Sequence, residues 1–476
     1  RGGSSMSTQS APLWTLGASD LAAAIREKRT TSEEVVQAHL DRIADVNGEL
    51  NAVTVLLEEE ALDAARKADR ALASGEAVGP LHGVPITVKE NIDLAGSATT
   101  QGLRGLETAC PERDAPFTGQ LRSAGAIPIG RTNLPDLGLR WHTDNELRGP
   151  TRNPWDASRT PGGSSGGEGA ALATGMTSLG LGNDYGGSVR WPSQCCGTVA
   201  LKPTTGRIPR HLALVPQEAG ITAQLYSVDG PMARHVRDLR LVLAHVIAAD
   251  PRDPWWTNAP LEGPPVADPT RVAVVPDPDG LGVHPDVREG VNRAADALSS
   301  AGYAVEEATP PSTETGLRIW CESVVPEIRA TLLGAMKMLG GRDALAFLEL
   351  LLECVPDGGL PQYMRALADR NALAREWAVF HDRYPVVLGP VCTDPAFEVG
   401  HDLKGRETVD SLLRSMRLVT TVNLLGLPAV AVPTGVSGTL PQGVQLIGDR
   451  FREDLCLDAA EAIEAALGTL TPIDPR

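Results

Sequence analysis

The sequence comprises 476 residues and carries a formal net charge of −17, from 60 Asp and Glu against 43 Lys and Arg. This excess of negative charge repels nucleic-acid phosphates and anionic lipid headgroups, so nucleic acid and membranes are excluded as expected partners. No run of about 18 uncharged apolar residues is present that could span a bilayer. Seven cysteines, an odd number without a CxxC pair, predict reduced thiols in a soluble cytoplasmic protein and no metal site.

The chain is expected to form one α/β domain over residues 6–476. Residues 1–5 resemble the remnant of a tag ahead of Met6, and the residues after Met6 lack the basic and apolar regions of a secretory signal. There is no internal repeat and no low-complexity tail. A proline- and tryptophan-rich connection near 250–270 separates a first group of predicted elements from a second one.

The first group begins with helices and continues with short buried strands. Ser19 is predicted to cap the first helix, and the sequence TSEE at 31–34 has the form of a capping box ahead of an apolar repeat. An alanine-rich helix is predicted over 58–73. The apolar runs at 83–89 and 126–130 indicate strands.

The second group alternates strands with helices, which is typical of βαβ units. A strand opens at 271–276, an amphipathic helix covers about 284–301, and residues of about 312–381 are predicted to be mostly helical. Further strands are predicted at 303–305, 386–388, 429–432 and 443–447.

Lys89 ends the first of these strands and is a candidate base. A serine hydroxyl is a poor nucleophile until a base takes its proton, and none of the nine histidines lies in a recognisable catalytic setting. Burial lowers the pKa of a lysine by as much as about 3–5 units, so a buried Lys89 would supply the neutral amine that such a base requires. On this feature alone, a surface lysine remains the simpler interpretation.

A glycine-rich segment, PGGSSGGEG at 161–169, admits several interpretations. It matches the GxSxG nucleophile elbow with Ser165 as the nucleophile, which would require an acid and a histidine further along the chain. A phosphate-binding loop is disfavoured because Glu168 stands where Lys and Ser or Thr would follow the last glycine. A flexible linker is disfavoured by the alanine-rich helical run that comes next. A tight loop that feeds a helix fits best.

The sequence YGGS at 185–188 is the more specific signal. Two glycines ahead of Ser188 allow consecutive backbone N–H groups to turn toward one point. Such donors would form an oxyanion hole beside the nucleophile, and each is worth about 2.7–4 kcal/mol in catalysis.

Together these segments resemble the amidase signature family. Lys89 and Ser164 are 75 residues apart, and Ser164 and Ser188 are 24 apart, as is typical of that family. Flanking sequences agree at 130–135, 150–155, 201–207, 230–234 and 423–429. The resemblance covers nearly the whole chain, with a signature core at about 75–235, and weakens at about 312–385. It implies a mixed, twisted central sheet flanked by helices on both faces.

The resemblance also assigns roles to residues. Ser188 attacks the acyl carbon, Ser164 relays its proton, and neutral Lys89 accepts it; the peptide bond between Gly163 and Ser164 is expected to be cis. The oxyanion is expected to be held by backbone N–H groups of Tyr185, Gly186, Gly187 and Ser188. The residues expected to position this loop are Ser165, Asp184 and Arg190.

Two departures from the family pattern concern the substrate. Tyr185 stands where a small or β-branched residue is usual, so its phenol is expected to narrow the acyl pocket. The stretch 140–148 also departs, and we expect Trp141 and His142 to contact substrate. Specificity is expected to reside in the loops of 136–148 and 206–226, and in a variable helical segment at about 312–385 that caps the substrate.

The first functional hypothesis is an amidase that acts on small neutral or aromatic amides through a seryl acyl-enzyme, without cofactor or metal. The same chemistry would cleave aryl esters and carbamates, as in a urethanase. The second hypothesis is an amidotransferase component, the A-type chain of the glutamyl-tRNA enzyme, which shares this signature and works in a complex. A non-catalytic module is a third. A homodimer is the assembly that the family implies.

Overall fold

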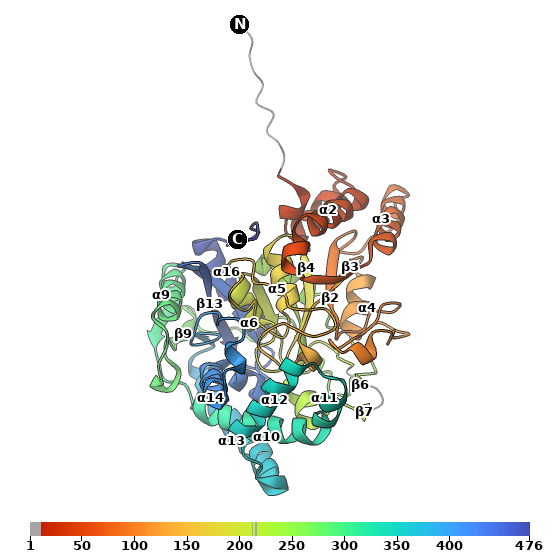
Figure 1. Ribbon diagram of the computed structural model, residues 1–476. Helices are drawn as coiled ribbons and strands as arrows, with labels where there is room; N and C mark the ends of the chain where they lie inside the picture. Colours follow the sequence, from red (N-terminus) through yellow and green to blue (C-terminus); the bar gives the residue numbers. More distant parts are fainter. Residues whose placement is uncertain (1–10, 212, 215–216) are drawn as a thin grey trace.

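A single mixed β-sheet runs through the protein, which we describe from a computed structural model (Figure 1). The structure describes residues 11–211, 213–214 and 217–476, so the predicted tag remnant at 1–5 lies outside it. Eleven strands follow the order β1-β3-β2-β4-β8-β5-β12-β13-β11-β9-β10. Their bounds are β1 Val53–Leu56, β2 Pro85–Lys89, β3 Ile127–Thr132, β4 Leu179–Asp184, β5 Val199–Lys202, β8 Val228–Ala233, β9 Arg271–Val274, β10 Ala304–Glu307, β11 Val386–Gly389, β12 Ala429–Ser437 and β13 Leu440–Gly448.

Parallel pairs at the two sides of the sheet enclose an antiparallel centre. Strand β2 runs parallel to both β3 and β4, and β9 runs parallel to both β10 and β11. The strands between β4 and β11 pair antiparallel, as do β1 and β3. The predicted mixed α/β architecture is therefore confirmed. Outside this sheet, β6 (Ala213–Leu214) pairs antiparallel with β7 (Gln217–Glu218).

Helices cover both faces of this sheet. Their bounds are α1 Ala18–Arg26, α2 Ser32–Leu50, α3 Glu58–Ala73, α4 Pro116–Ser123, α5 Gly166–Ala173, α6 Arg190–Cys196, α7 Ile221–Tyr226, α8 Val236–Leu243, α9 Pro285–Ser300, α10 Thr313–Thr331, α11 Leu333–Leu339, α12 Arg342–Cys354, α13 Gly359–Arg383, α14 Arg406–Ser415, α15 Arg417–Leu425 and α16 Glu453–Leu467. None of them, in the part of the chain that the structure describes, combines the length and apolar character needed to cross a membrane.

The sheet divides the hydrophobic core into two layers, because successive side chains along each strand point to opposite faces of the sheet. In β12, Val430 and Val432 pack into the layer formed with α1, α4, α8, α9 and α16. Ala429 and Ala431 pack on the opposite face, against the layer that contains α6, α10 and α12–α15. The small alanine side chains let that second layer approach the sheet closely.

Most of the predicted elements are confirmed, with small shifts. The capping box is present, since the Thr31 hydroxyl accepts the Glu34 N–H and the Glu34 carboxylate accepts the Thr31 N–H. The prediction that Ser19 caps the first helix is wrong: α1 begins at Ala18, and Ser19 donates two hydrogen bonds to Asp238 across 219 residues of sequence. The helical segment expected at about 312–381 is formed by α10–α13, the teal and cyan part of Figure 1.

Candidate active site

The three sequence segments meet at one edge of the sheet. Lys89 is the last residue of β2 and Asp184 the last of β4. These strands are parallel neighbours, so their carboxyl ends lie side by side. Helices α5 and α6 begin at the same edge, directly after Ser165 and Val189. The glycine-rich segments are thus the loops that connect this edge to two helices.

The Lys89 ammonium group is fully buried and surrounded by polar oxygens. Its Nζ donates to Ser164 Oγ at 2.7 Å, to Ser165 Oγ at 3.0 Å and to Asn183 Oδ1 at 2.7 Å. None of these three acceptors is an anion. Burial therefore lowers the pKa of Lys89 from its usual value to about 7, against the opposing effect of the more distant Asp184 carboxylate. A large fraction of this amine is neutral near neutral pH.

The loop that carries Ser164 is packed too closely for larger residues. The peptide bond between Gly163 and Ser164 is cis, as the family resemblance implies. A Cβ atom at Gly163 would lie 2.5 Å from the carbonyl oxygen of Arg140, and one at Gly167 would lie 2.4 Å from the backbone nitrogen of Asn133. Both glycines are therefore required by close backbone approach.

Ser188 lies at the end of the second loop with its hydroxyl facing a pocket. The side chain is 7% exposed, and its Oγ makes no hydrogen bond with any described residue. Its carbonyl accepts the Ser165 N–H at 3.1 Å, which ties the two serine-bearing loops together. Ser188 is thus held by its backbone while its hydroxyl remains available.

A buried ion pair fixes the loop from 184 to 190. The Arg190 guanidinium binds both carboxylate oxygens of Asp184, at 3.0 Å each, and also donates to the side chains of Gln445 and Asn423. Both members of the pair are buried. Burial alone would raise the pKa of Asp184, but the Arg190 charge outweighs it and holds that pKa well below the usual range.

The four backbone N–H groups expected to form an oxyanion hole are not equivalent. The Gly187 N–H donates to Asp184 Oδ1 at 2.8 Å, so it is already engaged. The N–H groups of Tyr185, Gly186 and Ser188 have no acceptor within the described ranges of the chain. The donors available at this loop are therefore fewer than the sequence suggested.

An apolar pocket adjoins Ser188. It has a cavity volume of about 40 Å³, and helices α10 and α12 supply much of its wall. Its lining residues are Gly138, Leu139, Arg140, Trp141, Tyr185, Gly186, Ser188, Trp320, Val324, Ile328, Phe347 and Leu351. Arg140 is the cation in this set. Its Nε and Nη2 donate to the buried Asp402 carboxylate, which balances the charge, and its Nη1 has no partner among the described residues. The wall therefore suits a neutral group.

The two residues predicted to contact substrate occupy different environments. Trp141 lines the pocket and meets Phe347 edge to face at 6.4 Å between ring centroids. His142 is 2% exposed, its Nδ1 lies 2.9 Å from the Thr160 hydroxyl, and it is not part of the pocket wall. Burial lowers the pKa of His142 to about 4, so this ring is neutral. The geometry favours Trp141 over His142 as a substrate contact.

Tyr185 also lines the pocket, as its size led us to expect. Its phenol hydroxyl lies 2.6 Å from the Thr222 hydroxyl, and its ring packs against Trp320 at 6.2 Å. Sequence reasoning expected the helical segment at about 312–385 to cap the substrate but did not identify Trp320, on α10, as part of the pocket. It did not identify Asn183, whose side chain accepts from Lys89, although this residue directly precedes Asp184.

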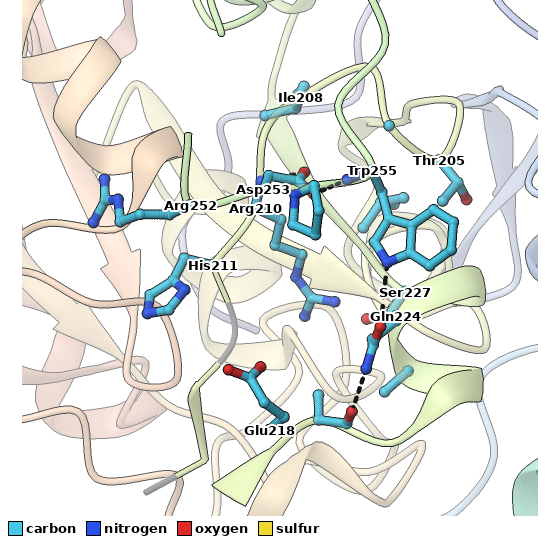
Figure 2. Close-up of a pocket in the computed structure, with 15 residues that line it drawn as sticks. Thr205, Ile208, Arg210, His211, Glu218, Gln224, Ser227, Arg252, Asp253 and Trp255 are labelled. Carbon is cyan, nitrogen blue, oxygen red and sulfur yellow. Dashed lines mark hydrogen bonds between the residues drawn. The ribbon is translucent and has the colours of Figure 1, made fainter. Parts of the chain in front are cut away.

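A second, more polar pocket has Arg210 in its wall. Asp229 is paired with Asn183 across β4 and β8, and it accepts from Arg210 at 3.1 Å. Figure 2 shows the Arg210 guanidinium directed into this pocket, between Glu218 and Gln224. The cavity volume is about 90 Å³. The Arg210–Asp229 pair has a small influence on Lys89 beside the effect of burial, since Asp229 raises and Arg210 lowers the pKa of that amine.

Comparison with known proteins identifies the family. The model of the Amidase family matches residues 34–457. The chain belongs to the amidase signature family. As a member of it, the protein is an amidohydrolase that acts on C–N bonds.

Several relatives of this amidase cover almost the whole chain. An indoleacetamide hydrolase of Bradyrhizobium diazoefficiens is 43% identical, over 96% of this chain and 88% of that protein. The A-type chain of the glutamyl-tRNA(Gln) amidotransferase of Moorella thermoacetica is 33% identical, over 95% and 96%. Among solved structures, a bacterial aryl acylamidase of the same family has a TM-score of 0.83 at 25% identity, covering 96% of this chain and 97% of that one.

Proposed function

We propose that this amidase hydrolyses small neutral amides with an aromatic acyl group, through an acyl-enzyme on Ser188. Ser164 relays the proton and Lys89 is the base. The observation that carries the proposal is the buried Lys89 amine, 2.7 Å from Ser164 Oγ, close to an apolar pocket that Ser188 lines. Among the described residues of that pocket wall, Arg140 is the one charged side chain, and the buried Asp402 carboxylate balances its charge.

In the proposed acylation, Ser188 Oγ attacks the amide carbon as its proton moves to Ser164 Oγ, and the proton of Ser164 moves to Lys89 Nζ. This requires the two serine hydroxyls to close on each other when substrate is bound. The carbonyl oxygen becomes an oxyanion, which we assign to the free N–H groups of Gly186 and Ser188. The C–N bond then breaks, and the proton returns along the same path to the leaving nitrogen.

Deacylation repeats these steps with water. Lys89, again neutral, accepts a water proton through Ser164 while the water oxygen attacks the acyl carbon. The Ser188 ester bond breaks and Ser188 Oγ recovers its proton, which releases the carboxylic acid. Aryl esters and carbamates form the same kind of tetrahedral intermediate, so we propose them as further substrates.

The acyl preference is supported by the pocket and by the relatives. Trp141, Tyr185, Trp320 and Phe347 provide aromatic walls beside Ser188. The relative at 43% identity is an indoleacetamide hydrolase, and the identity to the amidotransferase chain is lower, at 33%. We therefore favour a stand-alone hydrolase with arylacetamides such as indoleacetamide as substrates. The helical segment at about 312–385 caps the substrate in this proposal.

A fluorophosphonate-labelling experiment with peptide mass mapping tests the nucleophile, alongside hydrolysis of indoleacetamide and a panel of anilides. We expect label on Ser188, and a loss of at least about 10³-fold in kcat for Ser188→Ala, since the nucleophile supplies most of this chemistry. Label on Ser165 would overturn the assignment. Glutamine hydrolysis that appears only with partner proteins would instead identify a component of an amidotransferase.

A further inference from the structure

Three consecutive carbonyl groups beside the proposed nucleophile are each held by a tryptophan. The Tyr185 carbonyl accepts from the Trp320 indole N–H at 3.3 Å, and the Gly186 carbonyl accepts from the Trp141 indole N–H at 2.9 Å. The Gly187 carbonyl accepts the backbone N–H of Trp191 at 2.7 Å, which is the first turn of α6. Two of these three bonds therefore come from side chains, and those side chains also line the pocket.

The carbonyl of a trans peptide fixes the N–H of the next residue. Because the peptide is planar, its C=O and N–H point in opposite directions. Anchoring the Tyr185 carbonyl therefore sets the direction of the Gly186 N–H, which has no acceptor in the described part of the chain. The next peptide is fixed at both ends, since Trp141 holds the Gly186 carbonyl and Asp184 accepts the Gly187 N–H.

The two indoles also enclose Gly186. A Cβ atom at Gly186 would lie 3.2 Å from Cζ2 of Trp320 and 3.8 Å from Cζ2 of Trp141. Both rings are nearly buried, at 5% and 7% exposed. The Gly186 backbone is thus held by ring contacts on one side and by hydrogen bonds at its own carbonyl and the preceding one.

We propose that Trp320 and Trp141 are positioning residues: Trp320 aims the Gly186 N–H at the oxyanion, and Trp141 steadies the peptide that follows it. This inference rests on the proposed acyl-enzyme chemistry and assigns to two pocket-wall residues a role in the transition state. Catalysis depends on donors that are already oriented where charge develops, so loss of either anchor should cost turnover more than substrate binding. Trp320 lies on α10, so the capping segment is also part of the catalytic geometry.

The test replaces Trp320 with Phe, which keeps an aromatic ring but removes the indole N–H. We expect kcat for indoleacetamide to fall about tenfold, the value of one ordinary hydrogen bond, with KM changed less than about twofold. Affinity for a trifluoromethyl ketone, which forms the tetrahedral oxyanion, should fall by the same factor as kcat. The pH profile should not move, because Trp320 does not contact Lys89.

Trp377→Phe is the matched control. Trp377 is fully buried on α13, and its indole N–H has no acceptor among the described residues. This variant makes the same substitution at a similar depth without touching the loop, so kcat and ketone affinity should stay within about twofold of the wild type. Trp141→Phe should lower kcat less than Trp320→Phe, because Asp184 still holds the other end of the peptide that Trp141 contacts.

Replacement of Trp320 by the isosteric benzothienylalanine covers the case in which the Phe variant fails to fold. Sulfur then takes the place of the N–H while the ring shape is kept. A tenfold loss of kcat supports the proposal, and unchanged kcat with unchanged ketone affinity overturns it. A rise in KM alone would assign Trp320 to packing. Ser188→Ala is measured in parallel. If this variant stays active, the proposed acyl-enzyme on Ser188 is wrong, and that outcome is distinct from any result with the Trp320 variants.

Discussion

The Asp184 carboxylate accepts the backbone N–H of Gly187 at 2.8 Å, one residue before Ser188. The same carboxylate is bound by the Arg190 guanidinium and by the Asn423 amide at 2.9 Å. A buried charge thus fixes the direction of a peptide beside the proposed nucleophile. The Arg190 charge keeps the pKa of Asp184 low despite burial, so the anchor is ionised at any working pH.

The first prediction is that Asp184→Asn lowers both stability and turnover. The substitution keeps the size of the side chain but leaves the Arg190 guanidinium buried without its counter-charge. Breaking a buried pair in this way costs about 3–5 kcal/mol in the free energy of unfolding. We also expect kcat to fall, because the Gly187 peptide loses its charged acceptor. Urea unfolding and steady-state kinetics measure the two effects.

Asp458→Asn is the control for this prediction. Asp458 pairs with Arg240 at 2.7 Å, but its side chain is 55% exposed. Exposed pairs contribute about 0–1 kcal/mol, so this variant should unfold close to the wild type. Equal unfolding free energies for the two variants would contradict a structural role for the Asp184 charge.

The second prediction is that activity rises with pH through the titration of Lys89. Burial lowers the pKa of this amine from 10.5 to about 7, and only the neutral amine accepts a proton. The active fraction therefore falls about tenfold per pH unit well below pH ~7 and is nearly complete above pH ~8. We expect kcat/KM for indoleacetamide to follow this single limb, measured from about pH 5 to about pH 9.

Glu168→Gln tests whether Lys89 is the group whose titration causes this rise of kcat/KM with pH. Glu168 is buried and bound by the hydroxyls of Thr87 and Thr132, and its negative charge raises the pKa of Lys89. Burial raises the pKa of Glu168 itself to about 7, so the effect is partial near neutrality. Removing the Glu168 charge should lower the pKa of Lys89, so the rise of kcat/KM should occur at lower pH. A limb that moves to higher pH, or that persists in Lys89→Met, would show that another group is responsible.

The resemblance to the amidase signature family, more than any single local motif, predicted which residues meet at the edge of the sheet. Lys89 ends a strand that its apolar run predicted, whereas β4, which leads to Ser188, was not predicted. The structure shows that β2 and β4 are parallel neighbours, so their carboxyl ends lie side by side. The glycines around Ser164 indicated close backbone approach, which the 2.5 Å distance at Gly163 confirms. The central sheet was predictable because most of its strands have their own apolar run.

The orientation of single groups was not predictable in this way. Trp320 reaches the Tyr185 carbonyl from a helix 135 residues away, and the side that a helical residue presents depends on tertiary packing. His142 stands beside Trp141 in the sequence, yet its ring is directed to Thr160. The commitment of the Gly187 N–H to Asp184 depends on loop dihedral angles that composition does not specify.

The third prediction concerns cysteine reactivity. Cys110 is exposed, whereas Cys195 and Cys196 are buried and burial raises the pKa of both thiols. Alkylation requires an accessible thiolate, so iodoacetamide should label Cys110 first under native conditions. We expect full amidase activity at the point of one label per chain, with the label located by peptide mass mapping. Labelling of Cys195 or Cys196 in the folded protein, or loss of activity with the first label, would contradict this.

The last prediction is that Phe347→Leu shifts the acyl preference toward larger groups. Phe347 lies on α12, is 2% exposed and meets Trp141 across the pocket. The cavity there is about 40 Å³, whereas a benzene ring occupies an engineered cavity of about 150 Å³, so large acyl groups require the wall to yield. Trimming one ring should raise the ratio of kcat/KM for naphthylacetamide over acetamide about 10- to 100-fold.

Phe380→Leu provides the comparison, since Phe380 lies on α13 and packs against the core without lining this pocket. Both variants lose the same atoms, with a smaller loss of packing at the half-buried Phe380, but only Phe347→Leu enlarges the space beside Ser188. The two kcat/KM ratios are measured on purified proteins, at a temperature well below both thermal midpoints. They show whether the space beside Phe347 receives the acyl group. Equal ratios in the two variants would mean that the acyl group binds elsewhere, and the aromatic wall would then be part of the core alone.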